Sequence, residues 1–293
     1  MVEKKINLGW ILRNLALWFV VLVTLFPIIH MLAVSLSGTK DVFKGAVSFL
    51  PLVNGKFGVS FEVYKMVLSD SALFRAYGNT ILYTVLGTFF ALFTLSTGAY
   101  ALSKPRRTPG GKLINFLVLI TMFFGGGMIP TFLVIKSYGM LDTIWAIVLP
   151  GAFSAYNCII MRSFFVGFPK EIEESGRLDG LNDIGILWYL VLPTSTAVLA
   201  TIGLFVAVGQ WNAFMNPLIY LNNEDMYPLQ IVLRQILLQS NMEQFEGANL
   251  NTQYAEDSVK YATIAVAVAP IMAVYPFLQK YFVKGVMIGS VKG

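Results

Sequence analysis

The sequence predicts an all-α membrane protein with six transmembrane helices and with both termini in the cytoplasm. Of its 293 residues, 56% are hydrophobic and only 13% are charged, and the mean hydropathy is +0.69. Soluble domains carry about 25% charged residues, so this composition is typical of a protein that spans a membrane several times. Six apolar stretches are each long enough to cross a hydrocarbon core of about 30 Å, which requires about 20 residues.

The first apolar stretch covers about residues 12–36. It contains Pro27, which we expect to kink the helix because proline removes a backbone hydrogen bond. It also contains His30, which could line a polar pathway or, alternatively, lie at the membrane interface near the end of the helix. A polar loop over 37–76 follows, and we expect a short helix within it at 61–68.

The second and third stretches cover about 77–102 and 113–135, and a strongly basic turn with the sequence KPRRTPGGK, at 104–112, joins them. The third stretch contains three successive glycines at 125–127, followed by Pro130. These residues weaken a helix at membrane depth, and such breaks occur where the backbone is buried in protein or lines a cavity. The alternative is close helix packing through small residues.

The last three stretches cover about 143–165, 194–219 and 259–283. A long, charge-dense insert at 168–193 separates the fourth stretch from the fifth. A second extramembrane segment, at 222–258, separates the fifth from the sixth. This segment contains PLQIVLRQILLQ, which is apolar on most faces, so we expect it to lie at the membrane interface or against a partner.

The orientation follows from the distribution of lysine and arginine. With the N-terminus inside, the cytoplasmic segments are 1–13, 103–112, 162–189 and 280–293, and they hold 13 of the 21 basic residues. Cytoplasmic loops are enriched in these residues, so we expect both termini and the charged insert in the cytoplasm. The same bias accounts for the net charge of +5 without a nucleic-acid partner. No small-residue cleavage site follows the basic N-terminus, so the first helix is expected to be retained.

The insert at 168–193, FPKEIEESGRLDGLNDIGILWYLVLP, has the pattern of an amphipathic helix interrupted by glycines. The interruptions are expected at Gly176, Gly180 and Gly185, and Asp179-Gly180 is expected to form a turn between two short helices. Its apolar stripe would consist of Ile172, Leu178, Leu181, Ile184 and Leu187. One apolar stripe beside a charged face is suited to docking on a soluble partner. The alternative is a solvated loop.

Several kinds of chemistry are missing from the sequence. It has no phosphate-binding loop of the form GxxxxGK[ST], and its single histidine and single cysteine make a catalytic triad or a Cys/His metal site untenable. We therefore expect no catalytic residues and no metal. The spans also lack carboxylates, which argues against a transporter driven by protons or sodium.

The interior of the spans is polar but uncharged. Amide and aromatic groups of this kind suit a polyhydroxylated solute, and interhelical hydrogen bonds are the alternative. The candidates for a substrate pathway are Tyr156, Asn157, Gln210, Trp211, Asn212 and Asn216, with Asn115 and Thr121 as further polar residues of the interior.

The insert resembles the "EAA" motif of ABC importer permeases, in which a glutamate and two small residues precede Asp-Gly and a later Leu-Pro. Glu174, Asp179, Gly180 and Pro193 match this motif, with Pro193 thirteen residues after Gly180. Ser175 and Gly176 keep small side chains where the family has alanines, whereas Leu181 replaces the alanine that follows the glycine.

Further stretches extend the resemblance over about 73–293. Asn79-Thr80 is similar to the start of the family's core, and the tail GVMIGSVKG is similar to the C-terminus of carbohydrate permeases of the maltose-importer class. The stretch IIMRSFFVGFPKEIEESGRLDG looks closest to permeases of oligosaccharide and polysaccharide importers, including alginate importers. The resemblance divides the chain into an N-terminal segment, 1–72, with the first helix and a periplasmic loop, and a core permease domain, 73–293.

The resemblance implies a type I ABC importer permease in the bacterial cytoplasmic (inner) membrane, with an oligosaccharide as substrate. The implied partners are a second homologous permease, two ATPase subunits that bind ATP and Mg, and a periplasmic solute-binding protein. No cofactor would belong to this chain. Coupling helices would lie near 169–188 and a tail that contacts the ATPases at 284–293. The implied coupling residues are Glu171, Glu174, Ser175, Gly176, Asp179, Gly180 and Leu181, and the implied tail residues are Gly289, Ser290 and Lys292.

Two other classes of protein compete with this interpretation. A secondary transporter or channel that works alone predicts ionisable residues inside the membrane, and these are missing. A membrane-embedded enzyme, such as a lipid-linked glycosyltransferase, predicts an acidic or histidine cluster at the interface. The carboxylates of the insert are the only such cluster, and docking explains them better.

Overall fold

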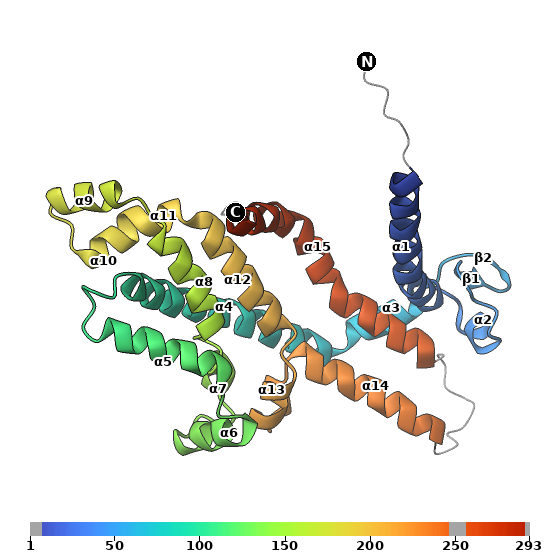
Figure 1. Cartoon of the computed structure of the whole chain (residues 1–293). Helices are drawn as coiled ribbons and strands as arrows, with labels where there is room; N and C mark the ends of the chain where they lie inside the picture. Colours follow the sequence, from blue (N-terminus) through green and yellow to red (C-terminus); the bar gives the residue numbers. More distant parts are fainter. Residues whose placement is uncertain (1–7, 246–255, 291–293) are drawn as a thin grey trace. The chain divides into compact units, whose positions relative to one another are not determined.

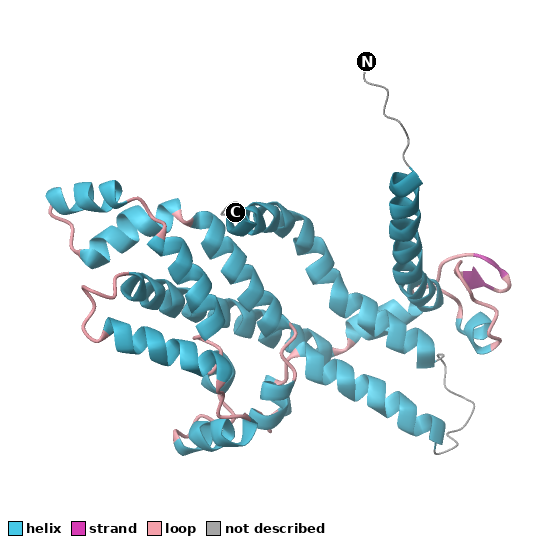
Figure 2. Ribbon diagram, viewed as in Figure 1, coloured by secondary structure: helices cyan, strands magenta, loops and turns pink. Residues whose placement is uncertain are grey.

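The computed structural model describes residues 8–245 and 256–290, and this part of the chain is helical apart from one small hairpin (Figure 2). It forms two compact units, of which the first comprises residues up to Phe74 together with Leu233–Ile271. The second comprises Arg75–Val232 together with the residues from Met272 onward. Figure 1 labels the elements in chain order.

The first unit is built on the long apolar helix α1 (Leu8–Ser35), which continues through Pro27 without ending. Ala33 and Val34 at its C-terminal end pack with Val47 and with the ring of Tyr261. The other elements of this region are α2 (Thr39–Phe43), the antiparallel hairpin β1 (Leu52–Val53) and β2 (Lys56–Phe57), and α3 (Glu62–Ser69), which is the short helix expected at 61–68.

His30 is held against the loop that follows α1. Its Nδ1 lies 2.8 Å from the backbone oxygen of Ser48, and its ring stacks on Phe26. A histidine engaged in this way favours the interpretation of His30 as a residue near the end of the helix over that of a pathway residue.

The second unit is organised around α4 (Ser71–Ser103), a single long helix that includes the second expected span. The third expected span is not one helix, because α5 (Gly111–Phe123) ends before the glycines and α6 (Met128–Ser137) begins after them. Gly127 has φ +83°, a backbone angle that glycine adopts without strain. No atom within 4 Å would meet a Cβ on Gly125 or Gly127, so within this chain the glycines serve a backbone break and not close packing.

The fourth expected span, 143–165, is also divided, into α7 (Ile144–Val148) and α8 (Ala155–Val166). Pro150 and Gly151 lie in the gap, and Ser154 begins the new helix by accepting a hydrogen bond from the backbone N–H of Asn157. The single continuous helix expected there is therefore wrong.

The fifth expected span consists of α12 (Thr196–Trp211) and α13 (Met215–Tyr220), separated by 212–214. Before it come the charged insert, with α9 (Lys170–Leu178) and α10 (Asp183–Ile186), then a π-helix at Leu187–Val191 and α11 (Leu192–Thr194). The helical segment Asp183–Thr194 meets α12 at an angle of 84°. The remaining elements are a 3₁₀ turn at Glu224–Met226, α14 (Leu229–Phe245) and α15 (Glu256–Ser290).

Three described helices are long and apolar enough to cross a membrane, at Gly9–Ser35, Ser71–Ser103 and Glu256–Val274, or four if the bent pair counts as one span. The six expected spans therefore do not exist as six continuous helices. The main core of the second unit lies where α4, α8, the π-helix and α12 meet. It includes Leu95, Met161, Phe165, Val191 and Ile202, all nearly inaccessible to solvent.

Candidate coupling site

The charged insert folds into two short helices, α9 and α10, joined by a tight turn (Figure 1). Gly180 lies at this turn with φ +84°, the left-handed region in which a side chain is strained. The N–H of Leu181 donates to the oxygen of Gly176 at 2.9 Å, which closes the end of α9. Asn182 begins α10, because its side chain accepts a hydrogen bond from the N–H of Gly185 at 2.8 Å. The turn expected at Asp179-Gly180 is confirmed.

One face of α9 is buried against the segment that follows it. Gly176 lies on this face, and a Cβ there would come within 2.6 Å of Leu190 Cδ1. The expected interruption of the helix at Gly176 is wrong, because α9 runs through to Leu178 and the glycine serves a close approach instead. Ile186 and Leu187 join the same packing and belong to the main core.

The opposite face of the insert is exposed and mixes apolar and acidic residues. Leu178 is 90% exposed and Ile184 is 68% exposed, whereas large apolar side chains usually lie inside a protein. The exposed residues among the expected coupling set are Glu171, Glu174, Ser175, Asp179 and Gly180, while Leu181 is half-buried. Large exposed apolar side chains among polar groups are typical of a protein interaction surface.

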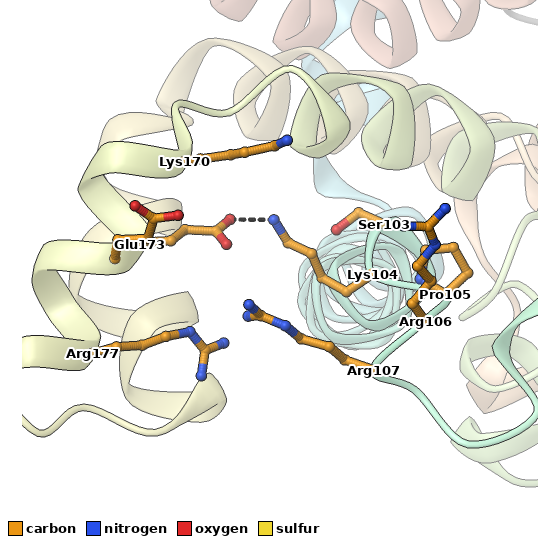
Figure 3. Close-up of a pocket in the computed structure, with 9 residues that line it drawn as sticks. Ser103, Lys104, Pro105, Arg106, Arg107, Lys170, Glu173 and Arg177 are labelled. Atoms are coloured by element: carbon orange, nitrogen blue, oxygen red, sulfur yellow. Dashed lines mark hydrogen bonds and ion pairs between the residues drawn. The ribbon is translucent and has the colours of Figure 1, made fainter.

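Glu173 plays a structural role that the sequence reasoning missed. Its side chain is only 6% exposed and forms an ion pair with Lys104, the residue directly after α4 (Figure 3). The helical spacing could have predicted that Glu173 is buried, because it lies three residues before Gly176 and thus on the same face of α9. The exposed neighbour Glu174 is the glutamate that matches the family motif.

Two further contacts tie the insert to its surroundings. Arg177 on α9 forms an ion pair with Asp183 at the start of α10, across the turn. The end of α4 is held by Arg162, whose Nε donates to the oxygen of Leu102 at 3.0 Å, and by Asn115, which donates to the same oxygen at 3.1 Å. The exposed face of α9 is therefore presented on a fixed support.

A pocket of about 370 Å³ lies between α9 and the loop that follows α4 (Figure 3). Charged side chains dominate its lining. They are Lys104, Arg106 and Arg107 from the loop, and Lys170, Glu173, Glu174 and Arg177 from α9.

Two of the candidate pathway residues, Gln210 and Trp211, lie at the end of α12 and contact α4. The side chain of Gln210 fits between two glycines, since a Cβ on Gly87 of α4 would lie 2.8 Å from its Nε2 and a Cβ on Gly151 would lie 2.9 Å from it. The ring of Trp211 lies 6.5 Å from that of Tyr77 on α4, measured between centroids. These neighbours come from segments far apart in the sequence.

The other candidates are placed less closely. Asn212 is exposed and its Oδ1 lies 3.4 Å from Gln230 Nε2, while Asn216 is exposed on α13. Tyr156 and Asn157 lie in the first turn of α8, and Tyr156 is exposed. Asn115 donates to the oxygen of Leu102 on α4, which is an interhelical hydrogen bond of the kind that the alternative expected, and also to that of Gly111. Thr121 donates to the oxygen of Val118 within its own helix.

Two threonines near Gln210 were not identified from the sequence. Thr84 and Thr88 lie on α4 one turn apart, with Gly87 between them in the sequence. Their hydroxyls are buried and, within the described chain, have no hydrogen-bond partner. Buried hydroxyls are normally paired, so these two are exceptions among the described residues.

The N-terminal part of α4 is bound to the segment that precedes α14. Asn79 donates to the oxygens of Asp225 and Tyr227, and Tyr83 donates to that of Met226 at 2.8 Å. The N–H of Leu229 donates to the hydroxyl of Thr80 at 2.8 Å.

Asp142 lies in the loop before α7 and receives three hydrogen bonds, from the N–H and side chain of Asn222 and from the N–H of Asn223. These bonds, led by the side chain of Asn222, lower the pKa of Asp142 below its ordinary value of 3.8.

The tail residues are described only in part. Gly289 and Ser290 lie in the last turn of α15, and Lys292 lies outside the described residues. Within residues 8–245 and 256–290, no three His, Cys, Asp or Glu side chains gather closely enough to hold a metal ion.

Comparison with known proteins identifies the class. No family model matches the chain. It is 42% identical over 272 residues to protein LplC of Bacillus subtilis (strain 168), covering 92% of this chain and 90% of the relative. It is 40% identical over 274 residues to the polygalacturonan/rhamnogalacturonan transport system permease protein YtcP of the same organism, covering 93% and 94%.

The fold agrees with this comparison. A chain in the crystal structure of a bacterial ABC transporter involved in the import of the acidic polysaccharide alginate matches with a TM-score of 0.87 and 36% identity, covering 96% of this chain and 99% of that one. The protein is thus an integral membrane protein of the ABC permease class. Within that class, the chain belongs to the permease subunits of carbohydrate importers. The resemblance found in the insert is confirmed.

Proposed function

We propose that this chain is one of two permease subunits of an ATP-driven importer of polysaccharide-derived oligosaccharides. The observation that carries the proposal is the two-sided insert. Its inner face is fixed by Gly176 and by the ion pair of Glu173 with Lys104, while its outer face exposes Leu178. Glu174 is also exposed, and it lines the pocket beside Lys104 as well. An ATPase subunit docked on that outer face would move a helix that is already braced against the membrane part of the chain.

Acidic glycans are the first substrates to test. The relative YtcP is described as a polygalacturonan/rhamnogalacturonan permease, and the alginate transporter handles an acidic polysaccharide. In this chain, Trp211 offers a ring for stacking and Gln210 offers an amide for hydrogen bonds to a sugar. The second permease and a solute-binding protein would complete the recognition.

The proposal includes a topology. If α5 with α6, α7 with α8, and α12 with α13 each form one broken span, then α1, α4 and α15 bring the number of spans to six. Both termini, the basic loop after α4 and the insert would lie in the cytoplasm of a bacterial cell, because the basic residues gather there. The segment from Asn222 to α14 would then face the solute-binding protein.

The test is a reconstitution. The chain would be co-purified with the subunits that it binds, placed in proteoliposomes, and supplied with ATP and oligogalacturonate or oligoalginate. We expect uptake that requires ATP and a copurifying ATPase. Glu174→Lys should weaken retention of the ATPase more than the nearby Glu171→Lys. A chain that purifies alone and moves sugar without ATP would refute the proposal.

A further inference from the structure

The pocket beside α9 carries excess positive charge. Five cationic side chains and two carboxylates line it, so its wall has a formal charge of +3. One carboxylate, that of Glu173, is already paired with Lys104. The cations come from two directions, from the loop after α4 and from α9 (Figure 3).

The cations of this pocket lie on both sides of the ion pair between Glu173 and Lys104. In Figure 3 the guanidinium group of Arg107 extends toward that of Arg177 on one side of this pair, and the side chain of Lys170 lies on the other side. The ion pairs of the described residues include none made by Arg107 or Lys170. Arg177 uses one terminal nitrogen for Asp183, while its Nε is buried without a hydrogen-bond partner. Cationic groups that line one pocket repel one another unless an anion lies between them, and guanidinium forks match the oxygens of phosphate.

The pocket lies where a membrane helix ends. The apolar helix α4 ends at Ser103, immediately before the basic loop, and the loop leads into α5. The first turns of α5 expose Leu113 and Phe116, which are 62% and 58% exposed. A cationic pocket at the end of a span, next to an exposed apolar helix, offers one site to a phosphate and one surface to acyl chains. A soluble anion would use only the first.

We propose that this pocket binds the phosphate group of an anionic phospholipid, whose acyl chains lie along α5. Its volume of about 370 Å³ is at the small end of ligand pockets, which suits a headgroup. Arg107, Lys170 and the terminal guanidinium nitrogens of Arg177 would hold the phosphate oxygens, while Lys104 remains paired with Glu173. A lipid bound in this pocket would connect α9 to the loop that follows α4, and so would help to hold α9 in place.

The test measures lipid binding by the purified complex in neutral detergent. Fluorescently labelled phosphatidylglycerol is titrated into the wild type, into Arg107→Gln/Lys170→Gln, and into Lys44→Gln/Lys136→Gln. The last variant removes the same charge from exposed sites outside the pocket. Each basic residue near an anionic lipid contributes about fivefold to binding, so the pocket variant should bind about 30-fold more weakly and the control should match the wild type. The readout needs no transport, so the inference can stand or fall separately from the proposed function.

Several results would overturn the inference. Equal binding by the two double variants would mean that the pocket holds no lipid. Displacement of the labelled lipid by millimolar inorganic phosphate or galacturonate would make it a site for soluble anions. Binding seen only after the ATPases are stripped away would make the pocket part of the protein interface. Phosphatidylcholine binding as tight as phosphatidylglycerol binding would remove the role of the negative charge.

Discussion

The ion pair between Lys104 and Glu173 supplies the sharpest test of how the insert is supported. Lys104→Met would leave the carboxylate of Glu173, whose side chain is 6% exposed, without its cation. Breaking a buried pair by removing one partner costs about 3–5 kcal/mol. The side chain of Lys104 is 21% exposed, so the pair is partly solvated and we expect the lower end, about 3 kcal/mol. That loss corresponds to a factor of about 100 in the folding equilibrium.

The two partners should not be equivalent. Glu173→Gln keeps the size of the side chain and one acceptor, and the lysine that it leaves can reach water, so its cost should be about 1 kcal/mol. Lys104→Met combined with Glu173→Gln removes both charges, and it should be less destabilising than the sum of these two single changes by about 2 kcal/mol. Lys136→Met is the control, because Lys136 is an exposed lysine outside the pocket and makes none of the ion pairs found in the described chain.

The assay is unfolding of the purified chain in mixed micelles by sodium dodecyl sulfate, followed by tryptophan fluorescence, alongside retention of the ATPase. If Lys104→Met were no more destabilising than Lys136→Met, the carboxylate of Glu173 would not depend on Lys104. If the double variant were as unstable as the sum of its parts, the two residues would not be energetically coupled, and the support inferred for α9 would fail.

Three further changes test other parts of the site. Gly180→Val places a β-branched residue at φ +84°, at a cost of about 1–2 kcal/mol, and should uncouple ATP hydrolysis from uptake while the complex still assembles; normal uptake would contradict the coupling role of the turn. Leu178→Ser should change the stability of the chain by less than about 0.5 kcal/mol, because Leu178 is 90% exposed, yet reduce ATPase retention on an affinity column; unchanged retention would remove Leu178 from the interface. Asp142 has a lowered pKa, so its hydrogen bonds stabilise the fold above pH 3.8 and this stabilisation is lost as the pH falls below that value. The difference in free energy of unfolding between the wild type and Asp142→Asn should therefore be constant above pH 3.8 and shrink below it. A difference that grows in acid would contradict the lowered pKa.

Local patterns of the sequence were sufficient for the elements that depend on near neighbours. The turn at Gly180 and the short helix at Glu62–Ser69 were predicted, because glycine and helical spacing act within a few residues. The breaks inside the spans were predicted only in part. Hydropathy measures the apolar length of a stretch and not the continuity of its backbone, so 143–165 was taken as one helix although the chain leaves the helical path between α7 and α8.

The glutamates of the candidate site show that local sequence patterns do not predict contacts with distant residues. Glu173 and Glu174 are adjacent and chemically identical, yet one is buried in an ion pair and the other is exposed. The motif identifies Glu174, but the role of Glu173 depends on Lys104, sixty-nine residues earlier in the chain. The same holds for Gln210, whose place is set by glycines on two other segments. Helical spacing can assign such residues to a face, and only the packing of distant segments against that face decides which of them support the helix and which are left for a partner.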